Sequence, residues 1–150
     1  GYNSQHNTTS WTTGDNWIGS LVQAMEDGGE WSSTTMFITY DDCGCFYDHV
    51  APPSPDLGIR LPLVIAGPYV RAGYTESTTT TWANVAAYIE ATFPTVQPIN
   101  AQDAGAYDFS NAVNYSQTPL SPPVMKVTPL PAGSRAYVKA HPYTGKNDAT

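Results

Sequence analysis

The chain has 150 residues, enough for one domain with a hydrophobic core, and charged residues make up only 13% of it. Its formal net charge is -7, and up to residue 125 the only basic residues are Arg60 and Arg71. This charge argues against nucleic-acid binding, which depends on Lys and Arg to neutralise phosphates, and it favours divalent cations as partners. The low charge and the many Ser, Thr, Asn and Tyr residues are typical of a secreted or cell-envelope protein.

A first helix is predicted from Asp15, a good N-cap, to the stop signal at Gly28 and Gly29. The apolar residues that recur at helical spacing are Trp17, Ile18, Leu21, Val22 and Met25. This spacing puts Trp17 on the apolar face, and so in the predicted core. Residues 1–14, which include His6, have no hydrophobic period and are predicted to form a loop.

Two strands and a second helix follow. Residues 34–40 are β-branched and aromatic without a polar-apolar alternation, and residues 60–70 form a second such run, as expected of strands covered on both faces in a parallel sheet. Residues 79–93 carry apolar side chains at helical spacing and end at Pro94. This order predicts an α/β fold with a mostly parallel sheet flanked by helices.

The last part of the chain has weaker signals. The sequence is rich in turn residues after Gln97 and rich in Pro after Thr118, and "RAYVKAHPY" near the end is predicted to be extended, as an edge strand or as part of a following segment. No run approaches the roughly 18 apolar residues that a membrane span requires.

The most informative stretch is "FITYDDCGCFYDHVAPP", residues 37–53. Asp41 and Asp42 stand at the carboxyl end of the first strand, where ligands collect in an open α/β sheet. Two converging carboxylates repel each other unless a cation lies between them, and a hard divalent cation held there could clamp a phosphoryl group. The alternative is structural, because Asp pairs after strands often form turns or cap helices.

Four more residues of this stretch have open interpretations. Asp48 and His49 are interpreted as a structural pair in which the carboxylate fixes the imidazole tautomer. Cys43 and Cys45 do not have the spacing of a structural zinc site. They remain either a disulfide, strained because the ring is short, or two thiols, one of which could pair outside this sequence.

The residues quoted above resemble the phosphoesterase family that contains bacterial phospholipases C and related acid phosphatases, a branch of the alkaline-phosphatase-like superfamily. The main motif is "ITYDDCGCFYDHVAPP", and "GIRLPLVIAGPYVRAGY" follows it at the expected distance. Three further segments also fit the family's pattern: residues 6–31, 81–93 and 103–120. The resemblance implies an alkaline-phosphatase-like fold.

The resemblance also implies a division of the chain. Residues 1–120 would be the carboxyl-terminal part of a phosphoesterase catalytic domain, and residues 121–150 an extended Pro-rich tail or the start of a following segment. The family's Ser or Thr nucleophile and a Glu-Asn pair lie upstream of the matched motifs. We therefore expect a partial domain, inactive or nearly so without the amino-terminal part of the same domain.

Roles for individual residues come from the resemblance alone. Asp41 and Asp42 match the paired acids that help to hold a catalytic divalent metal ion, and His6 matches a histidine that contacts or protonates the phosphate group. Asp48 and His49 match a supporting Asp-His pair beside the site. The implied reaction is metal-dependent hydrolysis of a phosphate ester or phospholipid, of the phospholipase C or acid phosphatase type, through a phospho-enzyme.

One alternative from another functional class stays open. The chain could be a non-catalytic exported binding module in which the acids hold a structural calcium ion. In this interpretation, exposed aromatic side chains bind a sugar or a surface: Trp11, Trp17, Tyr40, Phe46 and Tyr47. The predicted burial of Trp17 and Tyr40 argues against it.

Overall fold

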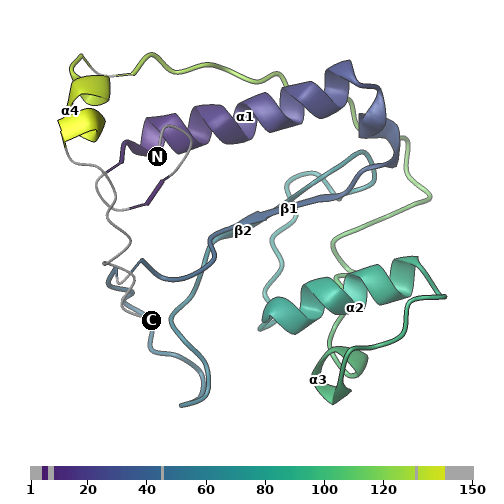
Figure 1. Ribbon diagram of the computed structural model, residues 1–150. Helices are drawn as coiled ribbons and strands as arrows, with labels where there is room; N and C mark the ends of the chain where they lie inside the picture. Colours follow the sequence, from purple (N-terminus) through teal and green to yellow (C-terminus); the bar gives the residue numbers. More distant parts are fainter. Residues whose placement is uncertain (1–4, 7–8, 45, 131, 141–150) are drawn as a thin grey trace. The chain divides into compact units, whose positions relative to one another are not determined.

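The computed structural model describes residues 5–6, 9–44, 46–130 and 132–140. Figure 1 shows its helices and its small sheet along the chain. The residues divide into two compact units. Unit 1 comprises Gly1–Trp31, Thr39–Leu63 and Pro122–Thr150, and unit 2 comprises Ser32–Ile38 and Val64–Ser121.

Helix α1, Trp11–Asp27, is the long element of unit 1. It begins four residues before the predicted Asp15, because Ser10 is the extended residue that precedes the helical backbone. Val22 is buried, with 3% of its surface exposed, whereas Trp17 is 43% exposed. The prediction that Trp17 lies in the core is therefore wrong, because the apolar face of α1 is only partly covered by the described residues.

The tail of unit 1 runs beside α1 (Figure 1). The side chain of Asn16 donates to the carbonyl oxygen of Thr128 (2.8 Å) and accepts from the Thr128 N–H (2.9 Å). Gly19 faces Met125, whose sulfur atom would be 3.7 Å from an added Cβ. Helix α4, Ser134–Ala140, follows, so most of the segment predicted to be extended is helical. Ala and Lys residues in that segment favour a helix.

The sheet consists of two strands, β1 (Met36–Thr39) and β2 (Leu63–Ala66), and it is antiparallel. A short 3-10 helix, Glu30–Ser33, precedes β1. The α/β prediction is supported, but the mostly parallel sheet is not found among the described residues. Parallel strands require a crossover, usually a helix, and the described residues between β1 and β2 form only turns and loops.

Gly67, directly after β2, allows two backbone segments to approach closely. A Cβ at this position would lie 2.7 Å from the carbonyl oxygen of Thr34. The predicted strand through Val70 continues only as an isolated antiparallel bridge between Val70 and Val113. The Asn114 N–H donates to the carbonyl oxygen of Tyr69 (2.7 Å). The turn-rich region after residue 97 thus supplies a backbone partner for the end of this strand.

The core of unit 2 is a cluster of aromatic rings against helix α2, Trp82–Thr92. The ring centroid of Phe37, on β1, lies 5.0 Å from that of Tyr88 and 5.4 Å from that of Phe109. Phe109 is 1% exposed. A capping box between Thr81 and Asn84 begins the helix.

A pair of acids joins α2 to the short helix α3, Ala101–Ala104. Burial would raise the pKa of Asp103, but N–H donors, from Ile99 to one carboxylate oxygen (2.7 Å) and from Asn100 to the other (2.8 Å), hold the pKa below its usual value. Burial and the hydrogen bond to Asp103 raise the pKa of Glu90. Of the two acids, Glu90 is therefore the first to take up a proton as the pH falls, and Asp103 keeps its charge to lower pH.

Replacing Glu90→Gln should flatten the pH dependence of stability. Because the folded-state pKa of Glu90 is raised, its contribution is full below the ordinary Glu pKa and is lost as pH rises through the raised value. A Gln amide donates to Asp103 at every pH. We expect the variant's melting temperature to exceed that of the wild type at neutral pH and to converge with it in acid.

Thermal melts between about pH 4 and about pH 8 test this expectation. Glu26→Gln, on α1, removes the same charge at another site and serves as the control. Equal pH profiles for Glu90→Gln and wild type would refute the proton-sharing contact.

Candidate functional site

Two acids begin the loop that follows β1. Asp41 and Asp42 are both exposed. The Asp42 N–H donates to Asp41 Oδ1 (3.1 Å), and the Gly44 N–H donates to Asp42 Oδ1 (2.6 Å). Gly44 has a φ of 54°, in the left-handed region that favours glycine. The chain leaves the strand in a turn that both acids stabilise, so the structural interpretation of the pair accounts for these contacts.

The predicted metal site depends on the same two acids. Carboxylate oxygens suit a hard divalent cation, and each carboxylate has two of them. Across the described residues no group of three or more His, Cys, Asp and Glu side chains could hold a metal ion. Asp41 and Asp42 therefore fit as part of a ligand set, to which other ligands would have to be added.

Asp48 anchors the part of the loop that follows Phe46 and Tyr47. Its carboxylate accepts from Arg60 Nε (2.9 Å), Arg60 Nη2 (2.8 Å) and the Val50 N–H (3.0 Å). The hydrogen bonds from Arg60 are the main reason that the pKa of Asp48 lies far below its usual value. The Asp48 side chain is only 13% exposed, compared with 65% for that of Arg60. Asp48 is thus a fixed anion that joins the loop to the segment before β2.

Sequence reasoning did not identify Arg60 as a partner. One signal was available: Arg60 is one of two basic residues before residue 126, and it follows a loop rich in acids. Asp48 and His49 were predicted to pair with each other, but the hydrogen bonds of Asp48 are made with other residues. The hydrogen bonds of Asp48 go to Arg60 and Val50, and the exposed His49 ring packs edge-on against Tyr47, with centroids 5.1 Å apart.

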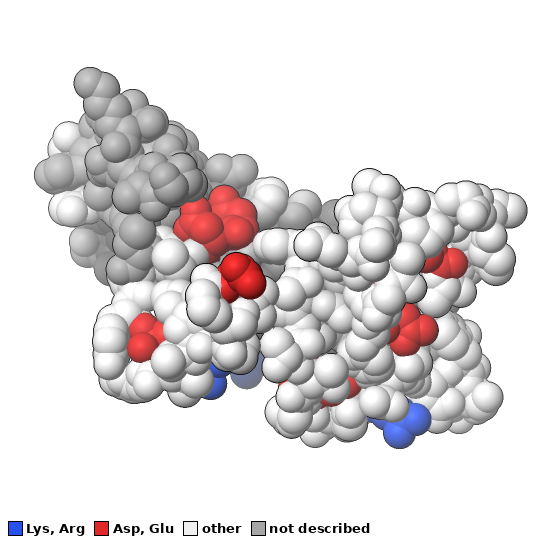
Figure 2. Space-filling model, turned by 90° about the horizontal axis from the view of Figure 1, so that it is seen from below, with Lys and Arg blue, Asp and Glu red and all other residues white. Residues whose placement is uncertain are grey.

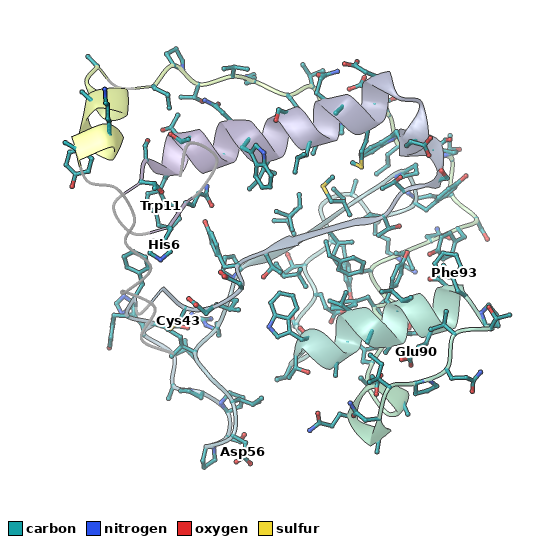
Figure 3. All side chains as sticks on the ribbon, viewed as in Figure 1. His6, Trp11, Cys43, Asp56, Glu90 and Phe93 are labelled. Carbon is teal, nitrogen blue, oxygen red and sulfur yellow. The ribbon has the colours of Figure 1, made fainter. Side chains whose placement is uncertain are left out.

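The structure places His6 in a turn directly before α1. The carbonyl oxygen of His6 accepts from the Thr9 N–H (2.9 Å) and the Thr9 hydroxyl (2.6 Å). The Gln5 side chain donates to the carbonyl oxygen of Trp11 (3.1 Å), which holds this turn against the start of the helix. In the view of Figure 3, His6 lies between Trp11 and Cys43.

Aromatic contacts connect α1 with the acidic loop. The Trp11 ring meets the ring of Tyr40, the residue before Asp41, at a centroid distance of 5.9 Å, and that of Phe46 at 6.1 Å. These contacts bring the start of α1, and with it the turn that contains His6, to the loop of the two acids. Trp11 was predicted in a loop, so its position here could not be inferred from helical spacing.

Cys43 lies partly buried in the same loop. Cys45 lies outside the described residues, so the predicted disulfide between Cys43 and Cys45 stays a prediction. Figure 2 shows that the visible face of the molecule carries many more acidic than basic side chains, as the net charge of -7 leads one to expect. Such a surface attracts cations.

Comparisons with known proteins cover most of the chain. The model of the Phosphoesterase family matches residues 1–96, which include the turn at His6, the acidic loop and α2. The chain is 26% identical to non-specific phospholipase C6 of Arabidopsis thaliana over 145 residues, 78% of this chain. It is 27% identical to non-hemolytic phospholipase C of Burkholderia pseudomallei (strain K96243) over 138 residues, 67% of this chain. These matches span 28% and 19% of the two relatives' own lengths.

Proposed function

The chain belongs to the Phosphoesterase family, and we propose on this premise that the protein carrying it hydrolyses phosphate esters in the manner of a phospholipase C. The match over residues 1–96, which contains Asp41 and Asp42, is the observation that carries the proposal. The names of the two phospholipase C relatives support the same reaction class. An acid phosphatase activity on soluble monoesters is the finer alternative within this class.

In this proposal Asp41 and Asp42 would hold a divalent metal ion together with ligands from outside the described residues. Such an ion, when bound, stabilises negative charge on phosphate oxygens. The turn at Gly44 and the contact between Asp48 and Arg60 stabilise the loop, and they would help to position both carboxylates before substrate binds. Asp48 is a positioning residue, and His49 has a supporting role.

The proton transfer is assigned to His6. An imidazole near neutral pH can donate a proton to a leaving-group oxygen, and the aromatic contacts of Trp11 bring its segment to the acidic loop. The nucleophile would be a Ser or Thr from another part of the same domain, and its attack would form the phospho-enzyme. The composition, poor in charge and rich in Ser and Thr, supports a secreted or cell-envelope location.

The test is turnover by the protein that carries this chain. We expect p-nitrophenol release from p-nitrophenyl phosphate or p-nitrophenylphosphorylcholine, loss of release after treatment with a chelator, and recovery when a divalent cation is added. The substrate that reacts faster separates monoesterase from phospholipase C chemistry. If the folded protein released nothing from either substrate, with or without added cations, the proposal would be refuted.

One observation favours the second candidate, an exported binding module with a structural calcium ion. Aromatic side chains near the acids remain exposed, with Tyr47 at 85% and Phe46 at 54%. Absence of turnover, together with a rise in melting temperature caused by calcium, would support this module instead.

A further inference from the structure

Helix α2 carries apolar side chains on two opposite faces. On its inner face Tyr88 is buried, and the Tyr88 ring contacts Phe37 of β1. On its outer face Trp82, Ile89 and Phe93 are 55%, 44% and 58% exposed. An α-helix has about 3.6 residues per turn, so Ile89 and Phe93 follow Trp82 by nearly two and nearly three whole turns. These three side chains therefore form one exposed apolar stripe along α2, called the outer stripe here.

The sequence around the outer stripe is almost free of charge. Residues 82–100 contain no Lys or Arg, and their one acid, Glu90, interacts with Asp103 of α3. Two exposed apolar residues follow the helix, Val96 at 43% and Ile99 at 82%. A solvated helix face is normally polar, so an apolar face of this length indicates an interaction surface.

The position of the outer stripe argues against coverage by more of the same domain. In α/β domains a helix packs on the sheet with one face and presents the opposite face to solvent. The inner face of α2 already packs against β1 through Tyr88 and Phe37. Further strands or helices of the domain would extend the sheet or cover its other side. The outer stripe is thus left for a partner outside the domain.

The size and chemistry of the outer stripe favour a lipid surface over a second copy of the protein. Stable protein–protein interfaces use about 20 to 30 residues on each side, far more than this stripe offers. Trp is enriched at membrane interfaces, because its ring is apolar while its N–H can remain in contact with water. Among the described residues, no helix is long and apolar enough to cross a membrane. With 11 residues, α2 would lie in the plane of the interface.

We propose that the outer stripe of α2 docks the protein on a membrane of zwitterionic phospholipid. The net charge of -7 opposes binding to anionic lipid. Because α2 has no basic side chain, the attraction comes from burial of apolar surface. Docking would also keep the protein beside a phospholipid substrate. This last step rests on the proposed function, whereas docking itself depends on the stripe alone.

Phosphatidylcholine vesicles are the direct probe. Sedimentation of the protein that carries this chain with such vesicles measures docking, and a chelator prevents turnover of the lipid. We expect saturable binding that persists when NaCl is raised from about 0.1 to about 1 M. Trp82→Ala should weaken binding about three- to tenfold. Trp17→Ala removes an exposed Trp from α1 instead and should bind as the wild type does.

A second variant and a lipid-free measurement keep docking separate from folding and self-association. Phe93→Ala should also weaken vesicle binding, and it decides the matter if Trp82→Ala loses its helical circular dichroism. Unchanged binding in the folded variants, or stronger binding to anionic vesicles, would overturn the proposal. So would a lipid-free dimer that Trp82→Ala dissociates, detected by ultracentrifugation, in a protein that does not bind vesicles.

Turnover distinguishes failure of this proposal from failure of the proposed function. In an active protein, Trp82→Ala should slow hydrolysis of phosphatidylcholine in vesicles and leave kcat/KM for soluble p-nitrophenylphosphorylcholine unchanged. Vesicle binding that depends on Trp82, without turnover of any ester, would uphold the docking surface and refute the hydrolase. An equal loss of activity on both substrates would refute a role of the outer stripe in docking.

Discussion

Asp42→Asn in the protein that carries this chain is expected to lower turnover of phosphate esters at least about a hundredfold. The substitution removes the negative charge but keeps an amide oxygen that can accept the hydrogen bond from the Gly44 N–H. The turn after β1 should therefore persist, so the loss would report on cation binding and transition-state stabilisation rather than on folding. Steady-state rates with p-nitrophenylphosphorylcholine measure the effect.

Asp56→Asn is the matched control, because Asp56 is another exposed acid of unit 1 and Figure 3 draws it at the far end of the loop between the strands. Elemental analysis of bound metal gives a readout that is independent of turnover. We expect Asp42→Asn to retain less metal than the wild type and Asp56→Asn to retain the same amount. Wild-type rates and metal content in Asp42→Asn would show that Asp42 serves only the turn.

Phe109→Ala should have the largest effect on stability in unit 2, about 3 to 5 kcal/mol in the free energy of unfolding. The side chain is 1% exposed and contacts the rings of Phe37 and Tyr107. Its backbone φ is 57°, a conformation that costs a non-glycine residue free energy. Alanine keeps that cost and loses the packing that offsets it.

Urea unfolding followed by circular dichroism measures the change, and hydrogen exchange assigns it to unit 2. Phe93→Ala provides the comparison, because Phe93 is 58% exposed at the end of α2. We expect less than about 1 kcal/mol for that variant. A loss of similar size in both variants would mean that the ring cluster is not the core of unit 2.

The helices were the most predictable elements. Repeated apolar spacing predicted α1 and α2, because that spacing reflects the geometry of the helix itself. The N-cap of α1 was predicted five residues too late, since Asp15 is as plausible a cap as Ser10 in the sequence. Exposure of Trp17 could not be inferred, because burial depends on what covers a helix and not on its own spacing.

The sheet was less predictable for a related reason. A continuous apolar run indicates a strand but carries no information on the direction of its neighbour, and β1 and β2 pair in the antiparallel sense. Local sequence likewise failed at α4, where "RAYVKAHPY" was predicted to be extended. The pairing direction of the strands depends on contacts between distant residues, whereas at α4 the helical propensity of Ala and Lys was underestimated.

Some features of the candidate site could be predicted from the sequence, and others required the structure. Asp41 and Asp42 could be singled out from the chain, because two adjacent acids after a strand are conspicuous in a sequence with few charges. Family membership was also predictable and is confirmed by the match over residues 1–96. The partnership of Asp48 with Arg60, 12 residues apart, and the contacts of Trp11 required the folded structure.

Along the sequence, segments of unit 1 precede and follow those of unit 2, and this order has a consequence for synthesis on the ribosome. Asn16 and Thr128, whose mutual hydrogen bonds hold the tail against α1, are 112 residues apart. At translation rates of about 5 to 20 residues per second, α1 waits roughly 6 to 22 s for this partner. All of unit 2, which ends at Ser121, is made within that interval. Vectorial synthesis therefore allows unit 2 to fold before the tail can pack against α1.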